Sequence, residues 1–265
     1  MTADAEDAFA AVADELRVRI LRELWDADDP LAFSDLRTRV DVRDSGRFNY
    51  HLGELRGRFV EQTDDGYELR FAGQKLVAAL HSGVYTEDAS VGPVPVDGTC
   101  FDCGGTLEAR YEDELGRVEC TDCGMNLVGG GVPPAFVDGR EDDLAAAIDG
   151  YLRTQIRQCA DGFCPQCSGP TTGFLEENDY GPQAVFECER CGAAFRGIAS
   201  MLALDHPAVV AFYHDHGRSV RNARIWELRW FDDVERDGDA ARVTVTVDGD
   251  ELELVVDDSL AVSVA

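Results

Sequence analysis

The chain has 265 residues, and its 52 acidic and 24 basic side chains give a formal net charge of -28 at pH 7. Hydrophobic residues make up 45% of the sequence, which excludes an intrinsically disordered chain, and the length is enough for roughly two folded domains. No apolar run is long enough to span a membrane, and the acidic beginning MTADAEDAFA lacks the pattern of a secretory signal, so we expect a cytoplasmic protein without membrane contact.

The acidic excess is accompanied by an almost complete replacement of lysine by arginine. Lys75 is the only lysine among the basic residues. An acidic surface repels itself in dilute buffer, and high salt relieves this repulsion. The composition resembles that of proteins from extreme halophiles, which accumulate salt in the cytoplasm. The alternative interpretation is an acidic surface that binds a partner.

Residues 1–83 are predicted to form a compact helical domain. A first helix has an apolar stripe that ends at the segment DADDP and consists of Phe9, Ala13, Leu16, Ile20 and Leu24. Ser34 and Ser45 are candidate N-caps of a second and a third helix. The third helix has an inward face formed by Phe48, Leu52 and Leu55.

A hairpin and a last helix complete this domain. In the segment FVEQTDDGYELRF, two short alternating runs flank Asp65-Gly66, which is a strong hairpin signal. A final helix is expected over Gly73–His81. The order helix, helix, helix, hairpin, helix is that of a winged helix-turn-helix.

The segment from Phe33 to Tyr67 resembles the ArsR type of winged helix. The third helix contains HLGEL at positions 51–55, which keeps the His-Leu-x-x-Leu core of that family, whereas Asn49 stands in place of the family's serine. The entry to the wing is shortened to RFV at positions 58–60, and the cysteine motif with which classical members sense metals is absent. The resemblance covers about a third of the chain, and the whole layout is similar to a haloarchaeal group of predicted ArsR-like regulators. It implies a regulator of transcription that binds double-stranded DNA as a homodimer.

The outward face of the third helix is the candidate DNA-binding surface. This face presents Arg47, Tyr50 and Glu54, with Asn49 and His51 on its flanks. Arginine can form two hydrogen bonds with guanine, and asparagine can do the same with adenine. Between residues 35 and 60, six arginines stand against four acidic residues, so this stretch is locally basic.

A solvated helix surface is the alternative interpretation of this face. His51 is expected to be a packed or phosphate-contacting residue rather than a metal ligand. The wing tip at residues 63–66 is acidic, so we expect it to hold phosphate weakly. The candidate DNA-binding residues are Arg43, Ser45, Arg47, Asn49, Tyr50, His51, Arg56 and Arg58.

Residues 84–98 are predicted to be a linker rich in Gly and Pro, and residues 99–265 a C-terminal domain that contains four Cys-x-x-Cys pairs. Two such pairs complete the four-sulfur tetrahedral shell that zinc prefers, and four sulfurs leave no open position for catalysis. We therefore expect two structural zinc ions, with iron in a rubredoxin-like shell as the alternative. The expected metal ligands are Cys100, Cys103, Cys120, Cys123, Cys164, Cys167, Cys188 and Cys191.

The spacing of the pairs predicts two sequential zinc ribbons, at 99–130 and 162–198, rather than an interlaced pair. Sixteen residues separate Cys103 from Cys120, and twenty separate Cys167 from Cys188, and each interval fits a short hairpin. Each ribbon is followed by an apparent helix, over Asp142–Gln158 and Pro207–Gly217, which indicates a repeated ribbon-and-helix unit. Cys159 remains outside the pairs and is expected to be a buried apolar residue.

Residues 224–265 alternate between apolar and polar side chains and predict an antiparallel β-meander of about four strands. The expected strands are IWELRWF, ARVTVTV, ELELVV and LAVSV, with Asp248-Gly249 as a turn. Trp226 and Trp230 are expected in the core rather than in a ligand pocket.

The sequence thus predicts an α+β protein: a winged helix-turn-helix, two tandem ribbon-and-helix units and a β-meander. We expect a sequence-specific DNA-binding regulator of transcription, with structural zinc in a domain for dimerisation, effector sensing or contact with the transcription machinery. No catalytic motif is present, so an enzyme is not expected. The alternatives are a basal factor similar to the archaeal transcription factor E family and a zinc-ribbon interaction or sensor module that does not bind DNA.

Overall fold

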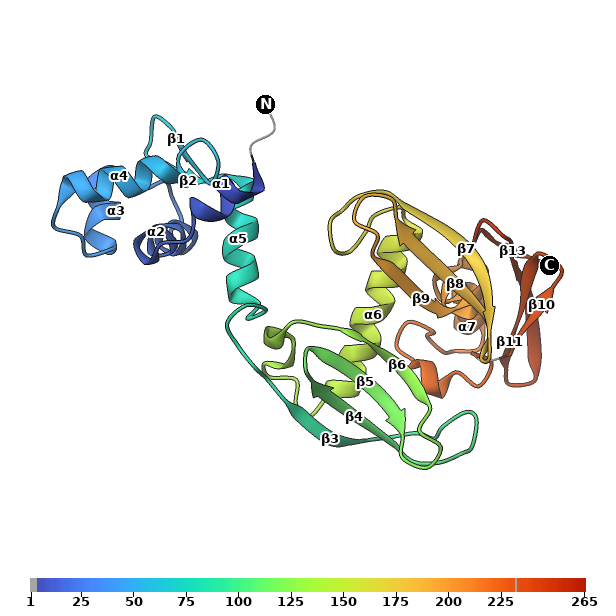
Figure 1. Ribbon diagram of the computed structural model, residues 1–265. Coiled ribbons are helices and arrows are strands. Elements are labelled where there is room, and N and C mark those ends of the chain that lie inside the picture. The colour runs from blue at the N-terminus through green and yellow to red at the C-terminus, as the bar shows by residue number, and fades with distance from the viewer. Residues whose placement is uncertain (1–3, 232) are drawn as a thin grey trace. The chain divides into compact units, whose positions relative to one another are not determined.

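The computed structural model describes residues 4–231 and 233–265, which divide into two compact units (Figure 1). The first unit contains the residues up to Asp88 together with Pro133–Ala135, and the second contains Ala89–Val132 and Phe136–Ala265. Each unit has a hydrophobic core of its own. Within the described residues, no helix combines the length and the apolarity needed to cross a bilayer.

The first unit contains five helices and one hairpin among its described residues. The helices are α1 (Ala5–Ala10), α2 (Glu15–Trp25), α3 (Phe33–Arg39), α4 (Ser45–Leu55) and α5 (Phe71–His81). The hairpin pairs β1 (Val60–Gln62) with β2 (Tyr67–Leu69) in antiparallel register. Apart from the short α1, this is the element order that the sequence predicts, and the predicted inward face of α4 is buried at Phe48, Leu52 and Leu55.

The prediction of one continuous first helix is wrong because the chain starts a new helix at Asp14. The Asp14 backbone is extended, and its carboxylate accepts hydrogen bonds from the N–H groups of Leu16 and Arg17. This N-cap separates α1 from α2. Phe9 therefore lies outside the buried stripe and is 72% exposed.

The two predicted serine caps are also wrong, by one or two residues. Helix α3 begins after Ala32, which makes no side-chain capping bond, so Ser34 lies within its first turn. The carboxylate of Asp44 caps α4, because it accepts hydrogen bonds from the N–H groups of Gly46 and Arg47. Aspartate and serine cap helices about equally well, so the residue types alone do not show whether Asp44 or Ser45 is the N-cap.

Among its described residues, the second unit contains three antiparallel sheets and two α-helices. The first sheet has the order β3 (Val91–Val96), β4 (Leu107–Glu112), β5 (Leu115–Cys120) and β6 (Asn126–Gly131). The second has the order β7 (Thr171–Asn178), β8 (Gly181–Cys188) and β9 (Ala194–Ile198). The third has the order β10 (Val234–Asp237), β11 (Ala240–Val247), β12 (Asp250–Val256) and β13 (Val262–Val264). The α-helices are α6 (Leu144–Ala160) and α7 (Pro207–Asp215), and the 3-10 helices are η2 (Ala199–Asp205) and η3 (Ile225–Glu227). A further 3-10 helix, η1 (Pro134–Val137), has residues in both units.

The predicted linker over residues 84–98 is partly wrong, since β3 lies within it. Val91, Val94 and Val96 pack against the core, and the strand pairs with β4. Pro93 and Pro95 are exposed on this strand, which is the edge of its sheet. Prolines are tolerated on an edge strand because one row of backbone groups needs no partner there.

Helix α6 packs against both ribbon sheets, so the predicted unit of one helix for each ribbon is not what the structure has (Figure 1). On one side α6 contacts β4, β5 and β6, and on the other it contacts β7 and β9. Gly130 makes the close approach to β6 possible, because a Cβ atom there would lie 2.7 Å from the Leu152 side chain. Helix α7 packs against η2, and its Tyr213 lies edge-on to Trp230.

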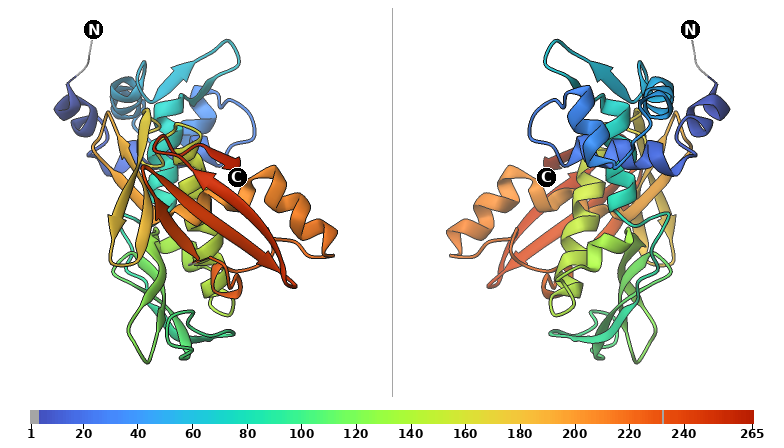
Figure 2. Two further views of the ribbon diagram at one scale, coloured as in Figure 1. Left: turned by 90° about the vertical axis from the view of Figure 1, so that its right-hand side faces the viewer. Right: turned by 90° about the vertical axis from the view of Figure 1, so that its left-hand side faces the viewer.

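The β-meander has four strands in sequential order, and Figure 2 shows it as one twisted sheet in red. Its predicted first strand, IWELRWF, is wrong: residues 225–227 form η3, and the meander begins at Val234. The reason is that adjacent residues are buried together, Ile225 with Trp226 and Trp230 with Phe231, whereas adjacent residues of a strand point to opposite faces. The Trp226 indole N–H donates to the carbonyl of Asp97 at 3.1 Å, and that of Trp230 donates to the Tyr213 hydroxyl.

Candidate metal centres and nucleic-acid interface

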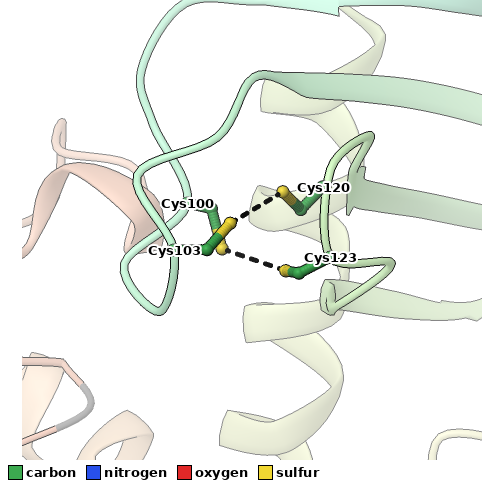
Figure 3. Close-up of side chains that lie close together, drawn as sticks. All are labelled: Cys100, Cys103, Cys120 and Cys123. Carbon is green, nitrogen blue, oxygen red and sulfur yellow. Dashed lines mark hydrogen bonds between the residues drawn. The ribbon is translucent and has the colours of Figure 1, made fainter.

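The first cysteine quartet lies at one end of the sheet β3–β6. Cys100 and Cys103 come from the loop before β4, and Cys120 and Cys123 come from the end of β5 and the turn that follows (Figure 3). The sulfur atoms of Cys100 and Cys123 are 3.8 Å apart, and those of Cys103 and Cys120 are 3.5 Å apart. All four sulfurs lie within 4.8 Å of one another.

The second quartet repeats this arrangement on the sheet β7–β9. The sulfur atoms of Cys164 and Cys191 are 3.7 Å apart, and those of Cys167 and Cys188 are 3.5 Å apart. The four ligands again lie within 4.8 Å of one another. The sequential pairing predicted from the spacing is therefore confirmed, and the interlaced alternative is wrong.

The sulfur spacing matches a tetrahedral metal shell. A zinc–sulfur bond of about 2.3 Å gives a tetrahedron with edges of roughly 3.8 Å, whereas a disulfide joins its sulfurs at about 2.05 Å. The measured distances of 3.5–3.8 Å agree with the former, and all nine cysteines are free of disulfides. Each quartet could hold one ion, which fits two structural zinc ions.

Each Cys-x-x-Cys turn is closed by the same backbone pattern. In the first turn the N–H of Gly104 donates to the carbonyl of Cys100, and the N–H of Cys100 donates to that of Gly105, each at 2.9 Å. The residue after the second cysteine has a positive φ in all four turns, which glycine adopts without strain. These residues are Gly104, Gly124, Ser168 and Gly192.

In each quartet, hydrogen bonds from backbone N–H groups lower the pKa of one thiol. The N–H of Cys123 lowers the pKa of Cys120 to about 7. The N–H of Cys191, which lies 3.5 Å from the Cys188 sulfur, lowers the pKa of Cys188 to about 6. At Cys123 the N–H of Met125 lowers the pKa, but the crowding thiols outweigh it and raise the pKa to about 12. Complete ionisation of four adjacent thiols therefore needs a cation among them.

Cys159 lies outside both quartets, in the last turn of α6. Its side chain is buried, as the sequence predicts, and burial raises the pKa of its thiol to about 11. A thiol with such a pKa is unreactive at neutral pH. Cys159 therefore acts as a small apolar residue of the core.

The candidate DNA-binding residues lie mainly on the exposed side of α4 and at its two ends. Ser45, Arg47, Asn49 and Tyr50 are exposed on the helix, and Tyr50 is 59% exposed. Arg43 is exposed before the helix, Arg56 is exposed directly after it, and Arg58 is half-buried. Exposed side chains that could contact DNA are thus present along the whole length of α4.

His51 differs from the other candidates because it faces α2. Its side chain is 12% exposed, and its Nδ1 accepts a hydrogen bond from Arg17 Nε at 3.3 Å. Arg17 also donates to the carbonyl of Ala10 and lies 5.8 Å from the centre of the Tyr50 ring. Little of the His51 ring is accessible to DNA, and it belongs to the contact between α2 and α4.

Arg17 is a residue that sequence reasoning missed. It is buried although it is charged, and its guanidinium lies 3.7 Å from the carboxylate of Glu54 on α4. Thirty-four positions separate Arg17 from His51, so no local pattern connects them. The sequence does not distinguish this buried arginine from the others, because arginine is common in the chain and most of the other arginines are on the surface.

Comparison with known families adds two matches. Residues 97–262, well over half of the chain, match the family described as Domain of unknown function (DUF7351). The chain belongs to this family. Residues 5–80 match a second family, described as Domain of unknown function (DUF7347). No curated protein and no solved structure matches the chain.

The DUF7351 region contains both cysteine quartets, α6 and the meander up to β13. The DUF7347 match contains α4 and all the candidate DNA-binding residues. The two families therefore separate the metal centres from the candidate nucleic-acid interface, as the two structural units do.

Proposed function

We propose that this protein is a sequence-specific DNA-binding regulator of transcription, in which the first unit acts as a winged helix. The observation that carries the proposal is the two-sided character of α4. One side is packed into the core through Phe48, Leu52 and Leu55, and the other exposes Arg47, Asn49 and Tyr50. A helix held in this way can enter the major groove without losing its packing.

In this proposal α4 is the recognition helix. Arg47 pairs with guanine and Asn49 with adenine, since both side chains can form two hydrogen bonds with a base edge. Tyr50 contacts a phosphate or a thymine methyl group, and Arg17 beneath it limits the motion of its ring. Arg43 and Arg56 lie near the two ends of the helix, where they can contact the phosphate backbone.

The local charge supports contact with DNA. Six arginines and four acidic residues lie between residues 35 and 60, in a chain whose net charge is -28. One of these acids, Asp44, caps α4 by accepting two backbone hydrogen bonds, so its charge is partly offset by the helix N-terminus. The hairpin contributes less, because its tip contains Asp64 and Asp65.

We further propose that the protein binds DNA as a homodimer. Two copies of α4 about 34–36 Å apart would enter successive major grooves on one side of the duplex. The second unit, held by zinc, would mediate dimerisation, effector sensing or contact with the transcription machinery. A dimer in solution at high salt and a palindromic binding site are the expected observations.

Selection from a random double-stranded DNA library in molar KCl tests the proposal. We expect one enriched palindromic site, and we expect Arg47→Ala and Tyr50→Ala each to weaken binding to it by about 5- to 150-fold, since a base contact contributes about 1–3 kcal/mol. Arg19→Ala, at an exposed arginine of α2, is the matched control and should bind normally. Failure to enrich any site, or equal affinity of all four proteins for DNA, would contradict the proposal.

A further inference from the structure

A large cavity of the second unit lies between its two ribbons. It has a volume of about 690 Å³, which is within the range of ligand-binding pockets. Strand β6 of the first ribbon lines one side, strand β9 of the second ribbon lines another, and Leu152 and Ile156 of α6 lie between them.

The edges of β6 and β9, rather than their faces, border this cavity. All six residues of β6 and all five residues of β9 line it. Successive side chains of a strand point to opposite faces of the sheet, so a cavity that meets every residue in turn must run along the edge of the strand. Both strands are indeed the last strands of their sheets.

These two edges have unpaired backbone groups. Within the described residues, β6 pairs only with β5 and β9 pairs only with β8. An open edge presents a row of N–H and C=O groups that an added strand can satisfy. Residues 129–131 are all glycine, so the backbone at this end of β6 carries no side chain that would keep another strand away.

The other lining residues are suited to an uncharged main chain. The apolar ones include Met201, Ile225 and Phe231, and the polar ones include the carboxamides of Gln155, Gln166 and Gln183. A carboxamide both donates and accepts, as a peptide group does. The cavity thus combines apolar contacts for side chains with hydrogen-bonding groups for a backbone.

The charged groups at the cavity favour a basic occupant. Asp102 and Asp179 line it, are exposed and form no ion pair among the described residues. Arg196, the one cation of the lining, lies 3.6 Å from the carboxylate of Glu176. The carboxylates of Asp102 and Asp179 can therefore pair with a lysine or an arginine of the ligand, while the charge of Arg196 is offset by Glu176.

We propose that this cavity binds an extended peptide segment of a partner protein, with a basic residue at one or both ends. The segment pairs with the edge of β6 or β9 as an additional strand, places alternate side chains on the apolar lining, and holds its basic residue near Asp102 or Asp179. This proposal does not depend on DNA binding by α4, so a negative result for DNA binding would not contradict peptide binding, and the reverse also holds.

An array of seven-residue peptides tests the proposal on the zinc-loaded full chain in molar KCl. The probes have alternating valine and threonine, with lysine at both ends in one set and glutamate in the other. We expect the lysine set to bind more tightly. Methylation of the alternate amide nitrogens that face the edge should weaken binding by about tenfold or more, because it removes backbone donors while the side chains stay the same. Hydrogen exchange should slow at residues 126–131 or 194–198.

Two variants and one control variant localise the binding. Gly131→Leu adds a side chain at the cavity where a Cβ meets nothing closer than 4.0 Å, so it should fold and block the peptide. Gly150→Leu, at a glycine of α6 with equally open space outside this cavity, is the matched control. Asp179→Lys should reduce the preference for lysine over glutamate ends.

Three results would overturn the proposal. The first is that no peptide of either set binds. The second is that the methylated peptides bind as well as the unmethylated ones, which would mean that only side chains are recognised. The third is self-association of the chain through these edges in sedimentation experiments, with loss of that association in Gly131→Leu, which would make a second copy the occupant.

Discussion

Ser168 adopts a backbone conformation that glycine has in the three corresponding turns. Its φ is 58°, against 73° for Gly104, 75° for Gly124 and 72° for Gly192. A side chain in this left-handed region costs roughly 1–2 kcal/mol. The turn between Cys167 and Gly169 is therefore the strained one of the four, although its sulfur geometry is the same as in the others.

Ser168→Gly should stabilise the second ribbon. The removal of the strain is partly offset by the greater freedom of glycine in the unfolded chain, so the expected gain in the free energy of unfolding is about 0.5–1 kcal/mol. Urea unfolding of the zinc-loaded protein measures it. Gly192→Ser is the reverse change and should destabilise by a similar amount; a loss of stability in Ser168→Gly would show that the serine has another role.

His216 connects the end of α7 with the meander. Its Nδ1 lies 2.8 Å from the carbonyl of Phe212, and its Nε2 lies 3.0 Å from the carboxylate of Asp250. Both partners are acceptors, and only the imidazolium form carries a proton on both nitrogens. The hydrogen bond to Phe212, followed by the one to Asp250, raises the pKa of His216.

This raised pKa predicts a loss of stability with increasing pH. The contribution is fully present below about pH 6.5, the pKa of an unperturbed histidine, and disappears as the pH rises through the higher pKa of the folded protein. NMR titration should give His216 a pKa above the value of about 6.5 for an unperturbed histidine. His216→Gln should remove this part of the pH dependence; a pKa of His216 at or below the unperturbed value would contradict the assignment.

At the scale of elements, α6 makes the two ribbons depend on each other. Leu152 and Ile156 both belong to the core that the ribbons share, and the helix contacts strands of both sheets. A ribbon alone buries little apolar surface, and structural zinc contributes on the order of 10–16 kcal/mol to folding. Loss of one metal should therefore disturb more than its own quartet.

Cys120→Ser tests this dependence. We expect one bound zinc instead of two, and faster hydrogen exchange in the strands of both ribbons, whereas α4 should remain protected because the first unit has its own core. Cys159→Ala, at the buried cysteine outside the quartets, should keep two zinc ions and is the matched control. Unchanged protection of β7–β9 in Cys120→Ser would mean that the ribbons fold independently.

The two quartets and the inward face of α4 could be predicted from the sequence because their signals are local. A Cys-x-x-Cys turn and an i, i+4, i+7 stripe each lie within a few residues. The shared packing of α6 could not, since periodicity shows which face is apolar but not how many partners cover it. Alternation also failed in IWELRWF, where the adjacent residues Ile225 and Trp226 are both buried in a 3-10 helix. The contact of Arg17 with His51 joins two helices and has no local signal.

At the scale of the whole molecule, the net charge of -28 opposes binding to a polyanion in dilute buffer. In molar salt the Debye length falls to about 3 Å, so this long-range repulsion is screened, and so is the attraction of arginine for phosphate. Binding under these conditions must then depend mainly on short-range contacts and shape.

A titration of DNA affinity against KCl, with the selected site and a scrambled one, tests whether α4 recognises DNA through short-range contacts. We predict that the protein keeps its preference for the selected site in molar KCl, that affinity changes little with salt, and that Arg47→Ala removes the preference. A steep loss of affinity with salt, approaching the slope of about -0.9 for each phosphate contact seen with ordinary basic regulators, or equal binding of the two sites, would contradict it.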